Sequence, residues 1–229
     1  MLRSILTSVI LSQAIKSSYA TRQDIPSAFS IVLPSRISGR RLQFETLLSM
    51  TAYSEPVKTP ASDIPYNFGP AALFDKTLFT AERPGNCCSE DASVSSSLVH
   101  EWIAFMKDQG IGHVLVLLDD NEFSIYQDPG LLELYQAGGL SYCQARMGDI
   151  GSYNRVMEYL QNVEKRGEMA VSHCTGGIGR AGRVASAWLV HRYNLDVEVA
   201  TKDVIHAAIE SKICRLGHSK KLSKWIGNI

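Results

Sequence analysis

The sequence feature that most constrains the fold is the nearly unbroken apolar run at residues 113–118, His-Val-Leu-Val-Leu-Leu. A strand without polar alternation is buried on both faces, which is typical of a parallel sheet covered by helices on each side. Shorter strands are predicted at 77–80, 141–146 and 169–172. Apolar residues at helical spacing predict helices at 95–109, 152–166, 197–211 and 219–226, and around Val184, Trp188 and Leu189. We therefore expect a three-layer α/β fold whose central, mostly parallel sheet has about four or five strands.

Composition excludes several classes of protein. The chain of 229 residues has no apolar run of about 18 residues, so a membrane-spanning helix is not expected. Its formal net charge of zero argues against a nucleic-acid partner bound through a basic surface. The five cysteines are an odd number and form no CxxC pair, which speaks against a disulfide framework and against a structural zinc site. We expect free thiols.

The neutral total hides an asymmetry along the chain. Residues 1–41 carry six basic residues and one acidic residue, whereas the remainder carries 17 basic and 22 acidic residues. A basic, serine-rich leader is typical of a targeting segment. A plastid or mitochondrial transit peptide is the preferred interpretation; a secretory signal peptide, or a disordered leader on a cytoplasmic protein, are the alternatives. Residues 42–75 contain scattered prolines and read as an irregular segment before a domain at 76–229.

Residues 173–180, His-Cys-Thr-Gly-Gly-Ile-Gly-Arg, join the strand at 169–172 to the following helix. Three glycines in four residues let the chain curl tightly, and amides that point inward at a helix N-terminus favour an anion. The same positive helix end stabilises a cysteine thiolate. Arg180 closes the loop with a planar group that can bind two phosphate oxygens. A nucleophile, an anion cradle and a cation thus surround one tetrahedral site.

This pattern resembles the His-Cys-x5-Arg signature of the protein tyrosine phosphatase superfamily, and within it the compact dual-specificity group. The loop is similar to the Cys-x-Gly-Gly-x-Gly-Arg of the cyclin-dependent-kinase-associated phosphatase group. A cysteine followed by an arginine six residues later is weak evidence alone, but the histidine, the glycines and the flanking strand and helix strengthen it. The resemblance covers 76–229 and implies the cysteine-based phosphatase fold and activity, without a metal or other cofactor.

The resemblance also implies roles for the loop residues. Cys174 would attack phosphorus and form a cysteinyl-phosphate. Arg180 would hold the phosphoryl oxygens together with the loop amides, contributed by Thr175, Gly176, Gly177, Ile178 and Gly179. His173 would orient the loop and help to keep the thiolate; a histidine that only packs in the core is the alternative.

The family places its general acid on a loop before the last helix that precedes the signature, and here Asp149 has that place. Gly148 and Gly151 flank it and would let the loop move, although the usual proline is absent and the spacing is short. A cap of the helix at 152–166 is the alternative for Asp149. Asp119 and Asp120 are the rival acids, and Asp120 is interpreted mainly as the cap of a short helix that starts at Asn121.

The substrate is less constrained. Ala181 replaces the usual Ser or Thr after the arginine, so slower breakdown of the covalent intermediate is expected. The loop lacks the lysines of phosphoinositide phosphatases, and a phosphoprotein is the expected partner. Alternatives are a glucan or small-molecule phosphatase with the same chemistry, and a phosphate-binding protein with weak turnover. Cys143 is interpreted as a buried structural thiol, with a disulfide to Cys174 as the alternative.

Overall fold

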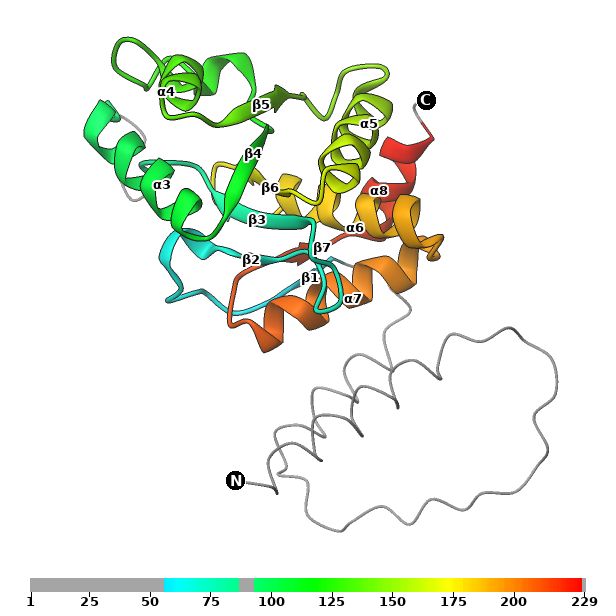
Figure 1. Ribbon diagram of the computed structural model, residues 1–229. Coiled ribbons are helices and arrows are strands. Elements are labelled where there is room, and N and C mark those ends of the chain that lie inside the picture. Colours follow the sequence, from blue (N-terminus) through cyan, green and yellow to red (C-terminus); the bar gives the residue numbers. More distant parts are fainter. Residues whose placement is uncertain (1–55, 87–92, 228–229) are drawn as a thin grey trace, which may run out of the picture. The chain divides into compact units, whose positions relative to one another are not determined.

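The computed structural model describes residues 56–86 and 93–227; the leader at 1–41 lies outside these residues. Figure 1 labels most of the helices and strands. The strands are β1 (Val57–Lys58), β2 (Gly69–Pro70), β3 (Leu78–Glu82), β4 (Ile111–Val116), β5 (Ser141–Gln144), β6 (Met169–Cys174) and β7 (Leu216–Gly217). The α-helices are α3 (Ser96–Asp108), α4 (Leu131–Ala137), α5 (Ser152–Lys165), α6 (Arg180–Tyr193), α7 (Val197–Glu210) and α8 (Ser219–Ile226). Two 3₁₀ helices are η2 (Pro65–Asn67) and η3 (Asp120–Glu122).

Five strands form the central sheet in the order β2-β3-β6-β4-β5. β3, β6, β4 and β5 run parallel, and only the two-residue strand β2 pairs antiparallel, with β3. β6 is the middle strand, so the loop that follows it leaves the centre of the sheet edge. The predicted fold class, with its mostly parallel sheet, is confirmed.

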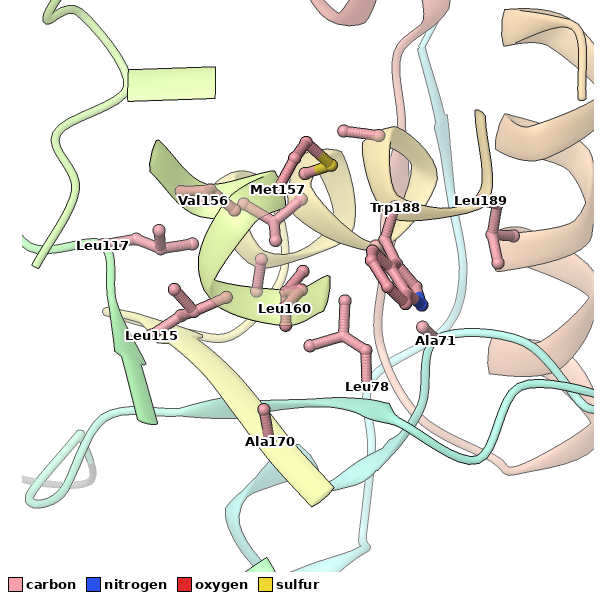
Figure 2. Close-up of a cluster of buried hydrophobic side chains, with 14 of the residues drawn as sticks. Ala71, Leu78, Leu115, Leu117, Val156, Met157, Leu160, Ala170, Trp188 and Leu189 are labelled. Carbon is pink, nitrogen blue, oxygen red and sulfur yellow. The ribbon is translucent and has the colours of Figure 1, made fainter. Parts of the chain in front are cut away.

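The two faces of the sheet have separate cores because side chains alternate along each strand. Leu115 of β4 and Leu117, the residue after β4, belong to a cluster with residues of α5, α6, α7 and α8, whereas Val114 and Val116 of β4 belong to a cluster with α3 and α4. Figure 2 shows the first cluster, in which Leu115 faces α5 and Trp188 of α6 lies near Leu78. Helices on both faces explain why the run at 113–118 carries almost no polar residue.

The chain before β3 packs against the chain after α7. β1 pairs antiparallel with β7, so that Val57 lies opposite Gly217. Thr59 donates its hydroxyl to the Ile213 carbonyl at 2.8 Å and accepts the Arg215 amide at 2.7 Å. These contacts join the start of the described chain to the segment between α7 and α8.

The long elements lie where the sequence predicts them, with two differences. The strand predicted at 113–118 spans Ile111–Val116; the Leu117 amide still donates to the His173 carbonyl at 3.0 Å, but the Leu117 carbonyl accepts from Arg180 Nη1 at 2.7 Å. Helix α4 and the two-residue strands were not predicted, since segments this short carry no periodic pattern. Among the described residues, no helix has the length and apolar character needed to cross a membrane.

Candidate active site

The centre of the candidate site is the loop between β6 and α6. Cys174 is the last residue of β6 and is 4% exposed, while Arg180 is the first residue of α6. Small residues at the start of α6 let the helix approach its neighbours: a Cβ on Gly182 would lie 3.1 Å from the Leu216 carbonyl oxygen. The fold therefore places the cysteine and the arginine at the two ends of one short turn.

Gly177 is required at the point where this loop crosses β3. Its φ of +65° is one that side chains rarely adopt, and a Cβ there would lie 2.4 Å from the Ala81 carbonyl carbon and 2.6 Å from the Glu82 nitrogen. The absence of a side chain lets the loop lie directly on the backbone of β3, so Gly177 fixes how deep the loop sits in the sheet edge.

The loop carbonyls point outward into hydrogen bonds. Backbone amides donate to four of these carbonyls: Arg83 to those of Cys174 at 2.9 Å and Thr175 at 3.2 Å, Leu216 to that of Ile178 at 3.2 Å, and Arg183 to that of Gly179 at 3.0 Å. Side chains donate to the other two: Asn67 Nδ2 to the Gly176 carbonyl at 3.1 Å, and Arg215 Nη1 to the Gly177 carbonyl at 2.8 Å. Within the described part of the chain, the main-chain amides of residues 175–179 donate no hydrogen bond. Carbonyls that are held outward leave amides that can face a bound anion.

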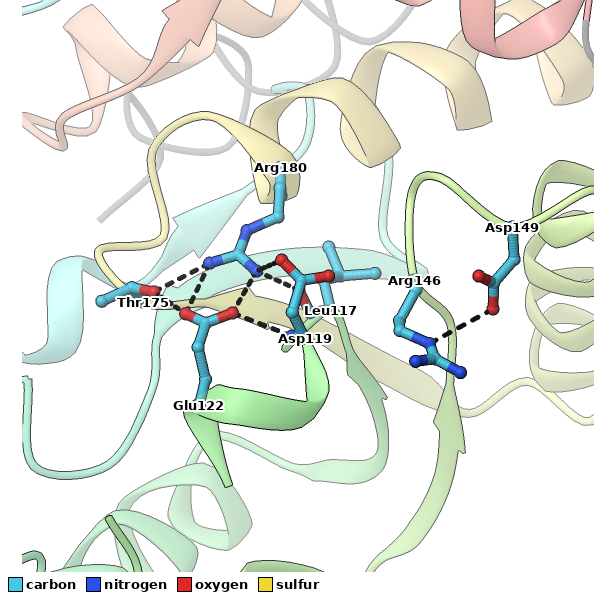
Figure 3. Close-up of polar contacts among 7 residues, drawn as sticks. All are labelled: Leu117, Asp119, Glu122, Arg146, Asp149, Thr175 and Arg180. Carbon is cyan, nitrogen blue, oxygen red and sulfur yellow. Dashed lines mark hydrogen bonds and ion pairs between the residues drawn. The ribbon is translucent and has the colours of Figure 1, made fainter. Parts of the chain in front are cut away.

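Arg180 is held in place by Glu122, a residue that the sequence analysis did not identify. Nη1 donates to Glu122 Oε2 at 2.5 Å and Nη2 donates to Oε1 at 2.7 Å, a two-pronged ion pair (Figure 3). Thr175 joins the group, since its hydroxyl donates to Glu122 and accepts from Arg180 Nη2 at 2.8 Å. The Asp119 carboxylate is farther from Nη1, at 3.4 Å.

Glu122 is ionised in this arrangement. Burial alone would raise its pKa, but hydrogen bonds from Arg180, Thr175 and the Asp119 amide outweigh burial and lower the pKa to about 2. The hydrogen bonds to Glu122 in turn raise the pKa of Arg180. The only sequence signal for Glu122 is its spacing from Asp119, Asp-x-x-Glu, which resembles a capping box.

η3 has this capping box, and it corrects one prediction. Asp119 is the N-cap residue, its side chain accepts the Glu122 amide, and the Glu122 side chain accepts the Asp119 amide at 2.8 Å. The prediction that Asp120 caps this helix is wrong, because the helix begins one residue earlier than expected. Asp120 instead accepts from Arg146 Nη1 at 2.5 Å and is largely exposed.

Asp149 lies in the turn between β5 and α5, apart from the loop. Its Oδ2 is 3.4 Å from Arg146 Nε and 3.9 Å from Arg155 Nη2. Figure 3 shows its carboxylate directed toward Arg146, which lies between Asp149 and the group around Arg180. The alternative that Asp149 caps α5 is wrong, since Gly151 is the N-cap residue and no side chain caps it. Cβ atoms on Gly148 and Gly151 would meet no neighbour within 4 Å, so space surrounds this turn.

His173 is fully buried on the α3 face of the sheet. Its Nε2 is 3.0 Å from the Tyr135 hydroxyl, and its ring contacts Trp102 edge-on. Burial, followed by the charges of Arg180 and Arg83, lowers the pKa of His173 to about 3, so the ring is neutral near pH 7. Any influence of His173 on the cysteine therefore comes from packing and dipole orientation and not from a positive charge.

Comparison with known families agrees with this geometry. The family model of Cyclin-dependent kinase inhibitor 3 (CDKN3) matches residues 87–201. "Cyclin-dependent kinase inhibitor 3" of Rattus norvegicus is 35% identical over 91 residues, which are 38% of this chain and 43% of that protein. The Homo sapiens protein of the same name is 33% identical over 91 residues, again 38% and 43%. The aligned region thus spans less than half the length of these relatives.

Solved structures with the same fold are also found. Kinase associated phosphatase, with its catalytic site cysteine replaced by serine, matches with a TM-score of 0.52 and 24% identity over 65% of this chain and 83% of that one. The active form of Tk-PTP matches with a TM-score of 0.50 and 18% identity over 69% of this chain and 95% of that one. These matches establish the shared fold.

Proposed function

The chain belongs to the cyclin-dependent kinase inhibitor 3 family, and from that premise we propose that it is a cysteine-dependent phosphatase. It hydrolyses phosphomonoesters through a cysteinyl-phosphate, with phosphotyrosine, phosphoserine or phosphothreonine of a protein as substrate. One observation carries the proposal. Every carbonyl from Cys174 to Gly179 accepts a hydrogen bond, whereas the amides of 175–179 donate none within the described chain. An oxyanion is the ligand that such a set of donors fits.

In the first step the Cys174 sulfur attacks phosphorus and the bond from phosphorus to the ester oxygen breaks. Charge on the phosphoryl oxygens is stabilised by the loop amides, which are fixed before the substrate arrives, and by Arg180. Asp149 gives its proton to the departing oxygen and must leave Arg146 to do so. In the second step Asp149 takes a proton from water as the water oxygen attacks phosphorus and the thiolate leaves.

Arg180 needs a rearrangement before it can bind phosphate with two hydrogens. Its four Nη hydrogens already face the Leu117 carbonyl, both Glu122 oxygens and the Thr175 hydroxyl, and the Asp119 carboxylate is a fifth acceptor at 3.4 Å from Nη1. Only the Nε hydrogen remains, while a two-pronged phosphate contact uses two. The neutral Thr175 hydroxyl is the weakest of these acceptors, so release of Nη2 from Thr175 is the step that opens the Nε–Nη2 edge.

The second step has no hydroxyl next to the arginine. Ala181 is fully buried and cannot donate to the departing thiolate, as a Ser or Thr could. We therefore expect hydrolysis of the cysteinyl-phosphate to limit turnover, with a burst of released alcohol in the first turnover.

Hydrolysis of p-nitrophenyl phosphate tests the proposal. We expect turnover by the wild type, none above background by Cys174→Ser, and a drop of about 10²–10³-fold in kcat for Arg180→Lys, which loses the planar donor pair. A wild type no faster than Cys174→Ser, yet able to bind tungstate, would instead identify a phosphate-binding protein without turnover. Cys143→Ser is the matched control and should keep wild-type turnover.

The acid is tested by Asp149→Asn beside Asp120→Asn. Removal of a general acid costs about 10²–10⁴-fold, so Asp149→Asn should lose this factor and the limb of the pH–rate profile that reports the acid. Asp120→Asn should lose neither. The reverse pattern would assign the acid to Asp120. A panel of phosphopeptides, phosphoglucans and sugar phosphates then separates the protein substrate class from the two alternatives.

A further inference from the structure

Arg215 is a buried arginine directly beneath the candidate phosphate-binding loop. It precedes β7, is 1% exposed, and donates only to neutral oxygens. Nη1 donates to the carbonyls of Gly177 at 2.8 Å and Cys214 at 2.7 Å. Nη2 donates to the carbonyls of Asn67 at 3.2 Å and Thr80 at 3.1 Å, and to the Thr80 hydroxyl. One guanidinium thus links η2, β3 and the loop.

The charge of Arg215 has no carboxylate partner. Among the described residues, no acidic oxygen lies within 4 Å of its nitrogens, in contrast to the ion-paired Arg146, Arg166, Arg180 and Arg192. Burial lowers the pKa of Arg215 to about 10, which still leaves it charged at neutral pH. A buried charge without a partner destabilises the fold, so a positive charge kept at this position points to an anion nearby.

The loop is where that anion would lie. Gly177, whose carbonyl Arg215 binds, is three residues from both Cys174 and Arg180, and a Cβ on Gly182 of α6 would lie 3.7 Å from Arg215 Cδ. The guanidinium therefore sits at the base of the loop. The negative charge of a Cys174 thiolate raises the pKa of Arg215, as expected for two groups that attract each other.

Other charged groups lie around the loop. Arg180 and Arg183 on α6 interact electrostatically with Cys174. Glu82 lies opposite Cys174 in the sheet, and the Arg83 amide donates to the Cys174 carbonyl. Asp119 and Glu122 contact Arg180. Glu122 is already neutralised by Arg180 at 2.5 Å. Arg215 differs from these groups in being 1% exposed and in donating from its side chain to a backbone carbonyl of the loop.

We propose that Arg215 is a second cation of the phosphoryl site and a positioning residue for it. It holds the Gly177 carbonyl outward, so that the neighbouring amides face the anion, and its charge stabilises from below both the thiolate and the bound phosphoryl group. This inference rests on the proposed function.

Two measurements test it on the full chain. The first is the rate of Cys174 alkylation by iodoacetamide against pH, followed on the Cys174 peptide by mass spectrometry. The second is the dissociation constant of tungstate by calorimetry. Arg215→Gln removes the charge, so half-maximal alkylation should move to higher pH by about one unit or more, the scale of one nearby charge at an effective dielectric constant of about 20. Tungstate should bind about tenfold more weakly.

Arg215→Lys and Trp225→Phe are the companion variants. Lysine keeps the charge but cannot span the four carbonyls, so we expect the wild-type alkylation profile with weaker tungstate binding. Trp225→Phe removes the hydrogen bond of 2.9 Å from Trp225 Nε1 on α8 to the Ser152 hydroxyl on α5 without changing charge and without touching Arg215. It should lower the melting temperature and leave both readouts within about twofold of wild type, which separates a loss of stability from a loss of charge.

The outcomes are distinct. Arg215→Gln with wild-type alkylation and tungstate affinity overturns the inference. If Arg215→Gln does not fold, Arg215→Lys decides: a shifted alkylation profile, or unchanged tungstate binding, overturns it equally. A wild type that binds no tungstate and reacts only at the pH of an ordinary thiol would contradict the proposed function and not this inference alone.

Discussion

Burial decides the charge state of the groups around the loop, and it acts differently on each of them. His173 is neutral, because burial lowers its pKa to about 3 although the charge of Glu122 acts in the opposite direction. Glu122 stays ionised because three hydrogen bonds outweigh the cost of burial. Arg215 stays charged because burial lowers its pKa only to about 10. Near pH 7 Arg215 therefore carries a positive charge beside the loop, whereas His173 is neutral.

The neutral state of His173 predicts a pH-dependent stability. The ordinary pKa of 6.5 applies in the unfolded chain and the lowered pKa of about 3 in the folded one. The contribution of neutral His173 to the free energy of unfolding is therefore fully present above pH 6.5 and is lost as the pH falls toward 3. Over this range the free energy of unfolding falls with a slope that approaches about 1.4 kcal/mol per pH unit. Urea unfolding at pH 7, 6 and 5 measures this slope. His173→Asn, which cannot be protonated there, should have the smaller slope, and parallel curves would contradict the prediction.

At the scale of single residues, the sequence identifies the reactive residues of the loop better than the residues that hold them in place. Cys174 and Arg180 follow from a local pattern within seven residues, so their placement at one loop needed no tertiary information. Glu122 is 58 residues from Arg180, and only the sheet order brings the ends of β4 and β6 together. The same holds for Arg215, whose partners come from three separate segments. The sequence pattern places the cap of η3 one residue late, because the adjacent residues Asp119 and Asp120 fit the capping pattern equally well.

Among the elements, the turn from β6 into α6 depends most on a single residue type. Gly177→Ala should be poorly tolerated, since it combines a φ of +65° with a Cβ 2.4 Å from the Ala81 carbonyl carbon. We expect a loss of about 2 kcal/mol or more, a fall of roughly 5 °C in melting temperature, and loss of tungstate binding. Gly179→Ala is the matched control for stability, because its φ is −90° and its Cβ would lie 3.9 Å from Leu216. Equal melting temperatures for the two variants would contradict this explanation.

Elements were predictable where burial imposes a period. The core face of α5, with Val156, Leu160 and Val163, and the two-sided burial of β4 both leave such a pattern in the sequence. α4 has only seven residues, and β1, β2 and β7 have two each, so these elements form through tertiary pairing and not through local preference. The fold class can therefore be predicted from the sequence, whereas the short edge elements that support the loop cannot.

For the molecule as a whole, the segment before β3 belongs with the catalytic loop more closely than its irregular sequence indicates. Asn67 bonds the Gly176 carbonyl at 3.1 Å and exchanges two further hydrogen bonds with the Cys214 backbone, at 3.0 and 2.7 Å. Thr59 fixes the position of Arg215 through its amide. The predicted domain start at residue 76 stays a prediction, and it would leave out both residues.

Two shortened chains, 56–229 and 76–229, test where the functional domain begins. We expect 56–229 to bind tungstate with the affinity of the full chain, because it retains β1, η2 and β2. The chain 76–229 should melt at a lower temperature and bind tungstate at least tenfold more weakly, since Gly176 loses its Asn67 donor and Arg215 loses an acceptor. Equal affinity in the two chains would place the boundary at residue 76. It would also mean that the sheet and α6 alone hold the loop, so that the contacts of Asn67 contribute nothing to anion binding.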